Sequence, residues 1–285
     1  MKPRYLLISD LDGTLACEGR VSEKSRAWLE KLGGDGVVRV LATGRSRLGV
    51  EKVLGTSIPM DYVLFSSGAG IMDWPNRTLL HSHGMSAEAI AEILPVVEAH
   101  GWGFMLHDAI PGNHGFQFHA TALSCPDFHR RVELLGPLGR AYRAGSTDAA
   151  TQFVVIVTKA QAEKSLEFLR ARLPGYSLIR ATSPLDGHST WIEIFPALVS
   201  KSQSAAWLCD HLGLSPRQAV AIGNDFNDLD LLEWAGHGYV VGQGLTHLRK
   251  PYPVVAPCHL EGFSEAVSAW HGRCILPPAD EGRTP

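Results

Sequence analysis

The sequence predicts an α/β protein in which a doubly wound parallel sheet forms the core and an α+β cap domain is inserted into it. Three observations predict this architecture. Short apolar runs alternate with amphipathic helical segments near both ends of the chain, which is typical of a parallel sheet with helices on both faces. In the middle, strand-like segments follow one another, as in an antiparallel sheet. Two apolar runs end in acidic clusters, Asp10–Asp12 and Asp225–Asp228, so we expect a Rossmann-like core with its chemistry at the carboxyl edge.

Composition limits the class of partner. The chain has 285 residues, of which 45% are hydrophobic and 19% charged, and its formal net charge is −3. These values are ordinary for a soluble protein and favour neither nucleic acid nor a membrane as partner. The five cysteines are odd in number and widely spread, which argues against a disulfide framework or a zinc ribbon. Because no signal-peptide pattern precedes the first strand, we expect a cytoplasmic protein, and we predict no protein partner.

The first apolar run, Leu6–Ile8, leads into Asp10 and Asp12 and then a Gly-Thr turn. A run of this kind is typical of a buried parallel strand, whose carboxyl end would carry both carboxylates. Two anionic groups this close repel each other, and Mg²⁺ or a shared proton would relieve the repulsion. An Asp-rich turn with a glycine is the alternative, and this stretch alone does not decide between them.

A helix over 22–32 and a second strand over 37–41 follow, with Ser22 as the helix cap. Strand, helix and strand in this order predict a parallel pair, which places Thr43 at the same edge as Asp10. A hydroxyl there can donate to a phosphoryl oxygen, as can the N–H groups at the start of the next helix. A plain strand-to-helix turn at Thr43-Gly44 is the alternative.

A third strand is expected over 62–65 and ends in the small residues Ser66-Ser67-Gly68-Ala69-Gly70. Small residues at that edge let a ligand approach the backbone. The segments 71–73 and 78–80 then form a hairpin pattern that interrupts the alternation of strands and helices.

The segment 84–188 is expected to form the cap, with its own core. The expected helices cover 86–100, with Ser86 as its cap, and 160–173, and the expected strands cover 101–106, 115–119, 151–158 and 177–181.

The alternation of strands and helices then returns, so the core is expected to comprise 1–83 and 189–285. A strand over 190–195 is expected in the core, followed by a helix over 200–212 with Ser200 as its cap. A buried strand over 219–222 leads into the acidic loop 223–228, before a helix over 229–234 and a strand over 238–242.

Four motifs in this order resemble those of the haloacid dehalogenase superfamily. They are Asp10-Leu11-Asp12-Gly13-Thr14, the strand-end Thr43, the helix-start Lys201, and the loop Gly223-Asn224-Asp225-Phe226-Asn227-Asp228. Each motif is weak alone, but the set is specific. The large insertion between the second and third motifs is similar to the cap of the Cof-type and sucrose-phosphatase-like branch, most members of which are sugar-phosphate phosphatases.

The resemblance implies a role for each matching position. Asp10 would be the nucleophile that forms an aspartyl-phosphate, and Asp12 the general acid and base. Thr43 and Lys201 would hold the phosphoryl oxygens. The further candidates for substrate contact at the core edge are Gly44, Arg45, Ser67 and Gly68, and a solvated helix start is the alternative for Arg45.

Mg²⁺ would be bound by Asp10, by Asp12 through its main-chain carbonyl, and by the loop residues Asn224, Asp225 and Asp228. The family's fourth motif usually has Asp directly after the glycine, where this chain has Asn224. Either Asn224 binds the metal through its amide oxygen or Asp225 takes that role, and Asp228 would be an outer ligand that orients Lys201 or a metal-bound water.

Cap residues are expected to contact the part of the substrate beyond the phosphoryl group. The candidates are His107, His114, His119 and Arg180. A zinc site built from His107, His114, His119 and His129 with Asp108 and Asp127 is the alternative, but their spacing matches no compact zinc motif.

We therefore expect a Mg²⁺-dependent phosphomonoester hydrolase that acts on a small phosphorylated metabolite, a sugar phosphate, through phospho-Asp10. A phosphomutase of the same superfamily shares the four motifs and is the first alternative. A non-catalytic ligand-binding module is the second, and only Asn224 favours it.

Overall fold

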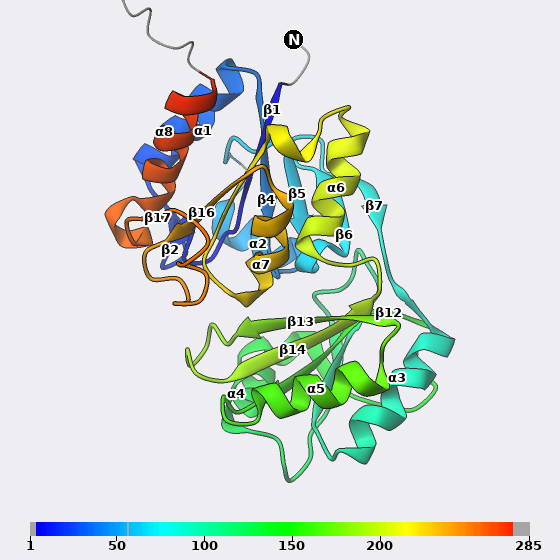
Figure 1. The fold of residues 1–285 in the computed structure, drawn as a ribbon. Coiled ribbons are helices and arrows are strands. Elements are labelled where there is room, and N and C mark those ends of the chain that lie inside the picture. The colour runs from blue at the N-terminus through cyan, green and yellow to red at the C-terminus, as the bar shows by residue number, and fades with distance from the viewer. Residues whose placement is uncertain (1–3, 56, 276–285) are drawn as a thin grey trace, which may run out of the picture.

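The computed structural model describes residues 4–55 and 57–275, which form a core and a cap (Figure 1). The core sheet has eight strands in the order β17–β16–β15–β1–β4–β5–β6–β7. Their bounds are β1 Tyr5–Ser9, β4 Val37–Ala42, β5 Tyr62–Phe65, β6 Gly70–Asp73, β7 Thr78–Ser82, β15 Ala219–Gly223, β16 His237–Val241 and β17 Val254–Val255.

The strands from β17 to β5 are parallel, and β5, β6 and β7 form an antiparallel meander. Ser9 lies opposite both Leu41 and Ile222, so β1, β4 and β15 end at the same level. The residues that follow these three strands therefore share one edge of the sheet. The predicted parallel pairs and the hairpin at 71–80 are confirmed.

Helices cover both faces of the core sheet, as a doubly wound fold requires. Their bounds are α1 Glu23–Gly34, α2 Arg47–Leu54 and α8 Gly262–Cys274 on one face, and α6 Lys201–His211 and α7 Leu229–Trp234 on the other. Leu7 of β1 packs toward the first group, whereas Leu6 and Ile8 pack toward the second, which follows from the two-residue period of a strand.

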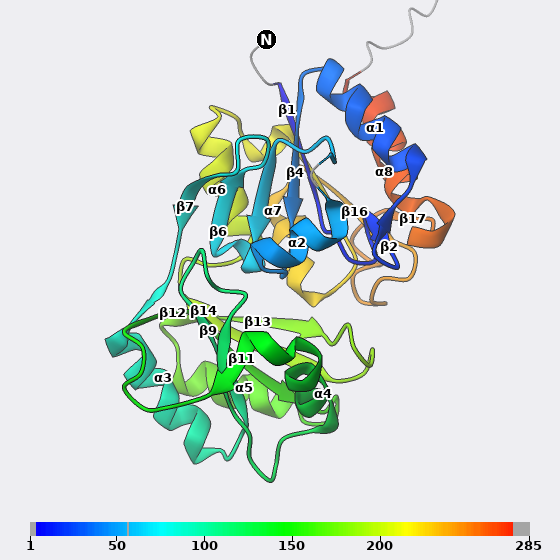
Figure 2. The ribbon, with the colours of Figure 1, turned by 180° about the vertical axis from the view of Figure 1, so that it is seen from behind.

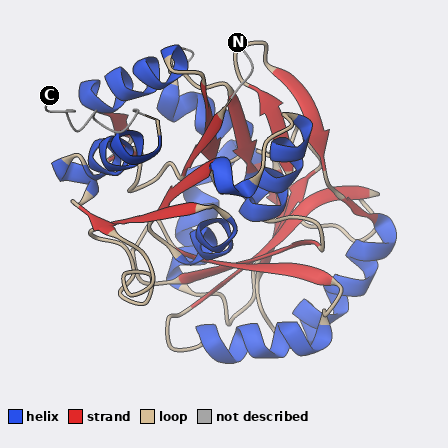
Figure 3. Ribbon diagram, turned by 45° about the horizontal axis from the view of Figure 1, so that its top comes forward, coloured by secondary structure: helices blue, strands red, loops and turns tan. Residues whose placement is uncertain are grey.

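The cap has a sheet in the order β11–β10–β9–β12–β14–β13, with β8 paired to β12. The strand bounds are β8 Met85–Ser86, β9 Phe104–Asp108, β10 Phe116–His119, β11 Gly139–Ala141, β12 Ala149–Val157, β13 Tyr176–Thr182 and β14 Thr190–Pro196. Helices α3 (Ala87–Ala99) and α5 (Ala162–Arg172) pack on one face, which Figures 1 and 3 show turned away from the core. Helix α4 (Pro126–Leu135) packs on the other face.

Strand β14 corrects one expectation. We expected the strand over 190–195 to belong to the core, but β14 pairs along its length with β12 and β13 of the cap. An apolar strand has the same local pattern in either sheet, so the pattern does not specify its partner. Figures 1 and 2 show the chain returning to the core only after β14. We therefore propose that the cap extends from 84 to about 196 rather than ending at 188.

Three predicted helix caps are confirmed. Ser22, Ser86 and Ser200 each accept a hydrogen bond from the N–H three residues later. The sequence missed α4 and α8, which begin without a side-chain cap, and it assigned no span to α2. It also missed the small hairpin of β2 (Ala16–Cys17) and β3 (Arg20–Val21). Within the described ranges, no helix has the length and apolar character needed to cross a membrane.

Candidate active site

The residues that follow β1, β4 and β15 meet at the carboxyl edge of the core sheet. Asp10 donates its N–H to the carbonyl of Ile222 at 2.9 Å, and Thr43 donates its N–H to the carbonyl of Leu64 at 2.9 Å. These main-chain bonds extend the sheet by one residue beyond the strand ends. They fix the direction in which the Asp10 and Thr43 side chains leave the backbone.

Lys201 lies between two buried carboxylates at this edge. Its Nζ donates to Asp10 Oδ1 at 2.7 Å and to Asp228 Oδ1 at 2.6 Å. Asp10 is 6% exposed, Lys201 1% and Asp228 0%. The first turn of α6, capped by Ser200, supplies the lysine, and the loop after β15 supplies Asp228. Three residues from distant parts of the chain therefore form one charged group.

Burial raises the pKa of the Asp10 carboxyl to about 7, and the neighbouring Lys201 opposes this rise. Burial alone would lower the pKa of the Lys201 ammonium, but the charges of Asp10 and Asp228 raise it above its ordinary value. The lysine is therefore a fixed positive charge at neutral pH.

Asp228 also shapes the fourth-motif loop. Its Oδ2 accepts from the N–H groups of Asn224 at 2.8 Å and Asp225 at 3.0 Å. A Cβ at Gly223 would lie 2.5 Å from the Asp228 Cβ, so glycine is needed for the loop to fold back this closely. Both Asp228 oxygens therefore already accept hydrogen bonds, from Lys201 and from the loop.

Asp12 forms a two-point ion pair with Arg45. The guanidinium donates through Nε to Asp12 Oδ2 at 2.7 Å and through Nη2 to Oδ1 at 2.8 Å. The Arg45 N–H donates to Thr43 Oγ1 at 3.2 Å. Arg45, which we expected to contact substrate, is therefore engaged with Asp12 in this structure.

Three of the predicted magnesium ligands fit a hard cation. Asn224 Nδ2 lies 3.1 Å from the main-chain carbonyl oxygen of Asp12, and a Cβ at Gly13 would lie 2.5 Å from that amide nitrogen. Amide oxygen and nitrogen are assigned from hydrogen bonds, and turning the amide over would bring its oxygen to the Asp12 carbonyl. With an Asp10 oxygen, this gives the all-oxygen donor set that Mg²⁺ prefers.

Asp225 does not join Asp10, the Asp12 carbonyl and Asn224. The expectation that Asp225 binds the metal with Asp10 is therefore wrong for this structure. Its two oxygens accept from the Thr182 N–H at 2.8 Å and the Thr182 hydroxyl at 2.9 Å. Thr182 is the last residue of β13, so Asp225 joins the core loop to the cap.

The zinc alternative finds no support in the structure. Residues 4–55 and 57–275 contain no group of three or more His, Cys, Asp or Glu side chains arranged to hold a metal.

Ser67 and Gly68 lie beside the same edge in a short 3₁₀ turn, Ser66–Gly68. Ser67 donates its N–H to the Thr43 carbonyl at 2.9 Å and its hydroxyl to Glu193 of β14 at 2.8 Å. A Cβ at Gly68 would lie 2.5 Å from the Ser200 carbonyl oxygen. Gly68 therefore allows the start of α6 to approach, whereas Ser67 links the core edge to the cap. A Cβ at Gly44 would meet Ser67 Oγ at 3.5 Å, which places Gly44 next to the same turn.

The predicted cap residues divide between the junction and the far end of the cap. His107 is buried, and its loop neighbour Asn113 donates to the core Ser66 Oγ at 2.6 Å. The Arg180 guanidinium lies 3.8 Å from the ring centre of Phe226 in the fourth-motif loop. His119 is exposed and pairs with Phe104, at the opposite end of the β9–β10 hairpin from His107. The expectation that His119 reaches the site is therefore wrong.

Sequence reasoning missed Glu193. It is 5% exposed and accepts from Ser67 Oγ and, at 3.1 Å, from Gln152 Nε2. The available signal was a single acidic residue inside an otherwise apolar strand, Trp191-Ile192-Glu193-Ile194-Phe195. Buried carboxylates are rare unless they have partners, so this position indicated a polar contact.

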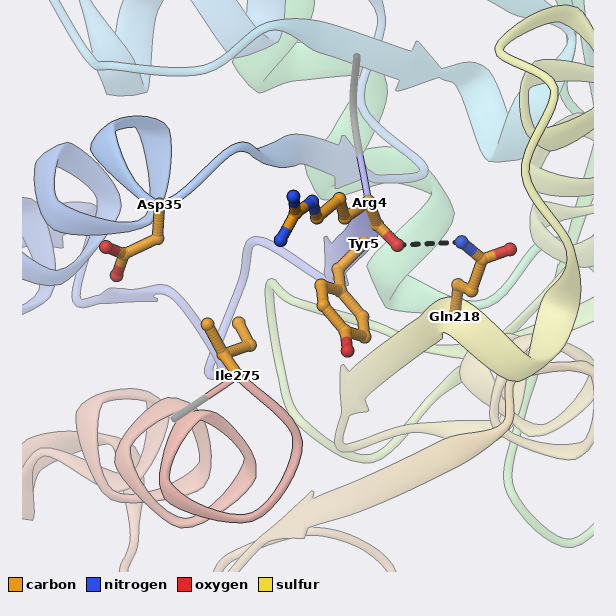
Figure 4. A pocket seen from close by; sticks show the side chains of 5 residues that line it. All are labelled: Arg4, Tyr5, Asp35, Gln218 and Ile275. Atoms are coloured by element: carbon orange, nitrogen blue, oxygen red, sulfur yellow. Dashed lines mark hydrogen bonds between the residues drawn. The ribbon is translucent and has the colours of Figure 1, made fainter. Parts of the chain in front are cut away.

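A cavity of about 240 Å³ lies elsewhere, at the amino end of β1 (Figure 4). It is lined by Arg4, Tyr5, Asp35, Gln218 and Ile275, and Gln218 Nε2 donates to the Arg4 carbonyl at 2.8 Å. Ligands of open α/β sheets bind at the carboxyl ends of the strands, and this cavity is at the other end. We assign it no chemistry.

Comparison with known proteins gives matches over most of the chain. The model of the haloacid dehalogenase-like hydrolase family matches residues 7–261. An HMP-PP phosphatase from Escherichia coli (strain 55989 / EAEC) is 24% identical over 291 residues, which cover 95% of this chain and 97% of that protein.

Solved structures share the fold. BT1666 from Bacteroides thetaiotaomicron, a phosphatase of the haloalkanoate (HAD) enzyme superfamily, is 18% identical with a TM-score of 0.76, over 94% of this chain and 96% of that chain. The HAD subclass IIB sugar phosphatase BT4131 is 18% identical with a TM-score of 0.74, over 93% and 98%. SMU.1108c from Streptococcus mutans UA159 is 14% identical with a TM-score of 0.77, over 94% and 99%.

Proposed function

Because this chain belongs to the haloacid dehalogenase-like hydrolase family, as a phosphatase of the Cof type, we propose that it hydrolyses the phosphomonoester of a small metabolite with Mg²⁺ as its cofactor. The observation that carries the proposal is the buried Asp10–Lys201–Asp228 group at the carboxyl edge of the sheet. A sugar phosphate is the substrate class that we propose, in line with the sugar phosphatase among the related structures.

Asp10 would be the nucleophile. Lys201 contacts its Oδ1, and Oδ2 has no side-chain partner among the described residues. Attack by a carboxylate oxygen forms a bond to phosphorus while the bond to the leaving oxygen breaks, which gives phospho-Asp10. Lys201 and the Thr43 hydroxyl would hold the other phosphoryl oxygens and offset their charge.

Asp12 would protonate the leaving oxygen and then take a proton from the water that attacks phospho-Asp10. That second attack releases phosphate and regenerates the Asp10 carboxylate. In this structure both Asp12 oxygens accept from Arg45, so the proposal requires this ion pair to loosen when substrate binds. Arg45 could then turn toward the phosphoryl group.

Asp10, the Asp12 carbonyl and the Asn224 amide oxygen would bind Mg²⁺. The cation would neutralise part of the negative charge that an anionic nucleophile and an anionic phosphate bring together. Asp225 is left out of this set because Thr182 occupies both of its oxygens.

The test is release of inorganic phosphate from a panel of sugar phosphates and from phenyl phosphate, with and without Mg²⁺. Asp10→Asn is the matched control, because it keeps the size of the side chain and removes the nucleophile. We expect turnover by the wild type only, with loss of activity after chelation. Turnover no higher than that of Asp10→Asn would overturn the proposal, and formation of a phosphorylated isomer without free phosphate would assign a mutase instead.

A further inference from the structure

The cap contains a buried polar cluster that the proposed chemistry does not use. Its members are His107, Asn113, Asp127, Arg131 and Glu193, none of which is more than 9% exposed. Four of their polar atoms lack a hydrogen-bond partner in the described part of the chain: Asn113 Oδ1, Asp127 Oδ1, Arg131 Nε and Arg131 Nη1. Buried polar atoms are normally paired, so two acceptors and two donors in one cluster indicate a place for a polar ligand group.

Arg131 is held in a fixed orientation. Its guanidinium carbon lies 3.8 Å from the ring centre of Trp191, and its Nη2 donates to His107 Nε2 over 3.3 Å. His107 Nδ1 lies 2.9 Å from the carbonyl oxygen of Asn113, so the proton of the neutral ring belongs on Nδ1. Burial lowers the pKa of His107 to about 3, which keeps the ring neutral. These contacts fix the guanidinium plane and leave Nε and Nη1 free to donate to a ligand.

The cluster borders the proposed phosphoryl site. Asn113 donates to Ser66 Oγ at 2.6 Å, and Glu193 accepts from Ser67 Oγ at 2.8 Å. Ser67 in turn donates its N–H to the carbonyl of Thr43. A substrate whose phosphoryl group lies at Asp10 and Thr43 would therefore extend its leaving group toward Arg131.

Charge limits what the cluster can accept. Two carboxylates, Asp127 and Glu193, act on the single guanidinium of Arg131. Lys201, whose charge also acts on Glu193, is already paired with Asp10 and Asp228. A second anionic group on the leaving group would face more negative than positive charge, whereas an uncharged hydroxyl could accept from Arg131 and donate to Asn113 or Asp127.

We propose that this cluster binds the leaving group of the substrate, that Arg131 is its specificity-determining residue, and that it favours an uncharged, hydroxyl-bearing leaving group over one with a second anionic group. The inference rests on the proposed phosphatase function and goes beyond it by assigning the discrimination to named cap residues.

The experiment compares kcat/KM for three substrates by phosphate release: phenyl phosphate, which has no polar group on its ring, glucose 6-phosphate and 6-phosphogluconate. For the wild type, kcat/KM for glucose 6-phosphate should be at least about tenfold higher than for each of the other two substrates. One or two buried hydrogen bonds to the leaving group would have an effect of this size. Arg131→Gln should lower kcat/KM for glucose 6-phosphate about tenfold or more and change that for phenyl phosphate less than about threefold. Asp127→Asn should reduce the discrimination against 6-phosphogluconate.

Arg130→Gln is the matched control, because this neighbouring side chain is exposed on the same helix. Circular dichroism checks folding, and Arg131→Lys, which keeps the charge but not the planar fork, replaces Arg131→Gln if the latter does not fold. An equal loss for phenyl phosphate and glucose 6-phosphate, or a wild type that prefers 6-phosphogluconate or phenyl phosphate, would overturn the inference while leaving the phosphatase function intact. No turnover of any of the three by the wild type would overturn the inference, and the wider panel of sugar phosphates then tests the proposed function separately.

Discussion

At the residue scale, Lys201 is the group on which the charge balance of the site depends. Its ammonium is enclosed between Asp10 and Asp228, and all three side chains are almost fully buried. Isolated buried charges are strongly unfavourable, so each carboxylate is stable there because the lysine is present. The same arrangement holds Asp10 in one orientation at the edge of the sheet.

Replacing Lys201 by Met should therefore lower both activity and stability. Two buried carboxylates would lose their partner, which we expect to cost about 3–5 kcal/mol of unfolding free energy and to abolish phosphate release. Urea titration measures the first effect, and Lys164→Met, at an exposed position on α5, is the control. An unchanged urea midpoint for Lys201→Met would contradict the ion-pair account.

Asn224 determines the charge of the proposed metal site. Asn224→Asp restores the acidic residue usual in the family, so Mg²⁺ should bind more tightly, with an increase of about tenfold or more in affinity. The readout is the rise in melting temperature with Mg²⁺ concentration, which depends on binding and not on turnover. A smaller Mg²⁺-induced shift for Asn224→Asp than for wild type would show that Asn224 is not a ligand.

At the element scale, the contact between β13 and the fourth-motif loop joins the cap to the core. Asp225 accepts both the N–H and the hydroxyl of Thr182, and Arg180 covers the ring of Phe226 in the same loop. β13 is the edge strand of the cap sheet, so its outer side would otherwise be unpaired. In this structure Asp225 therefore contacts the cap through both of its carboxylate oxygens.

Thr182→Val removes one of these two hydrogen bonds and keeps the shape of the side chain. A hydrogen bond to a charged acceptor contributes about 1.5–3 kcal/mol, so the Thr182 amide should exchange its hydrogen roughly ten to a hundred times faster. Hydrogen exchange measured on β13 and β14 would localise the effect, with Thr158→Val as the control in an exposed loop of the cap. Equal acceleration in both strands would indicate general loosening and not a local contact.

At the scale of the whole molecule, His107 couples stability to pH. Its pKa is about 3 in the folded protein, mainly because of burial and then because Arg131 is close, against about 6.5 in an unfolded chain. Between these values the unfolded chain binds one more proton than the folded chain. Stability should therefore fall as the pH drops below about 6.5, by about 1.4 kcal/mol per pH unit from this residue.

Urea unfolding measured between pH 5 and 7 tests this coupling, because His107→Asn removes the titrating group. In the variant, the free energy of unfolding should change less with pH, by the contribution of about one proton, and His129→Asn, at an exposed position, is the control substitution. If the His107→Asn slope equals that of the wild type, His107 is not the residue that couples acid to unfolding.

The sequence determined the parts of this protein that depend on local pattern. Seven of the eight core strands, all but β17, lie where the apolar period predicted them, as do five helices and three serine caps, and Asp10, Thr43 and Lys201 lie directly at strand or helix ends. Residues at such positions are placed by the backbone of the element itself. The predicted family is confirmed by the match over 7–261.

Only the tertiary structure decided which partners the remaining residues take. β14 joins the cap sheet, Asp225 turns to Thr182 and Arg45 to Asp12, and Glu193 meets Ser67 across the junction. Apart from the pairing of β14 with its neighbour β13, each of these contacts joins segments far apart in the chain. The same residue types occur in exposed loops and in either sheet, so the local sequence pattern does not specify the partner of each residue. The partner depends on which surfaces of the core and the cap pack together.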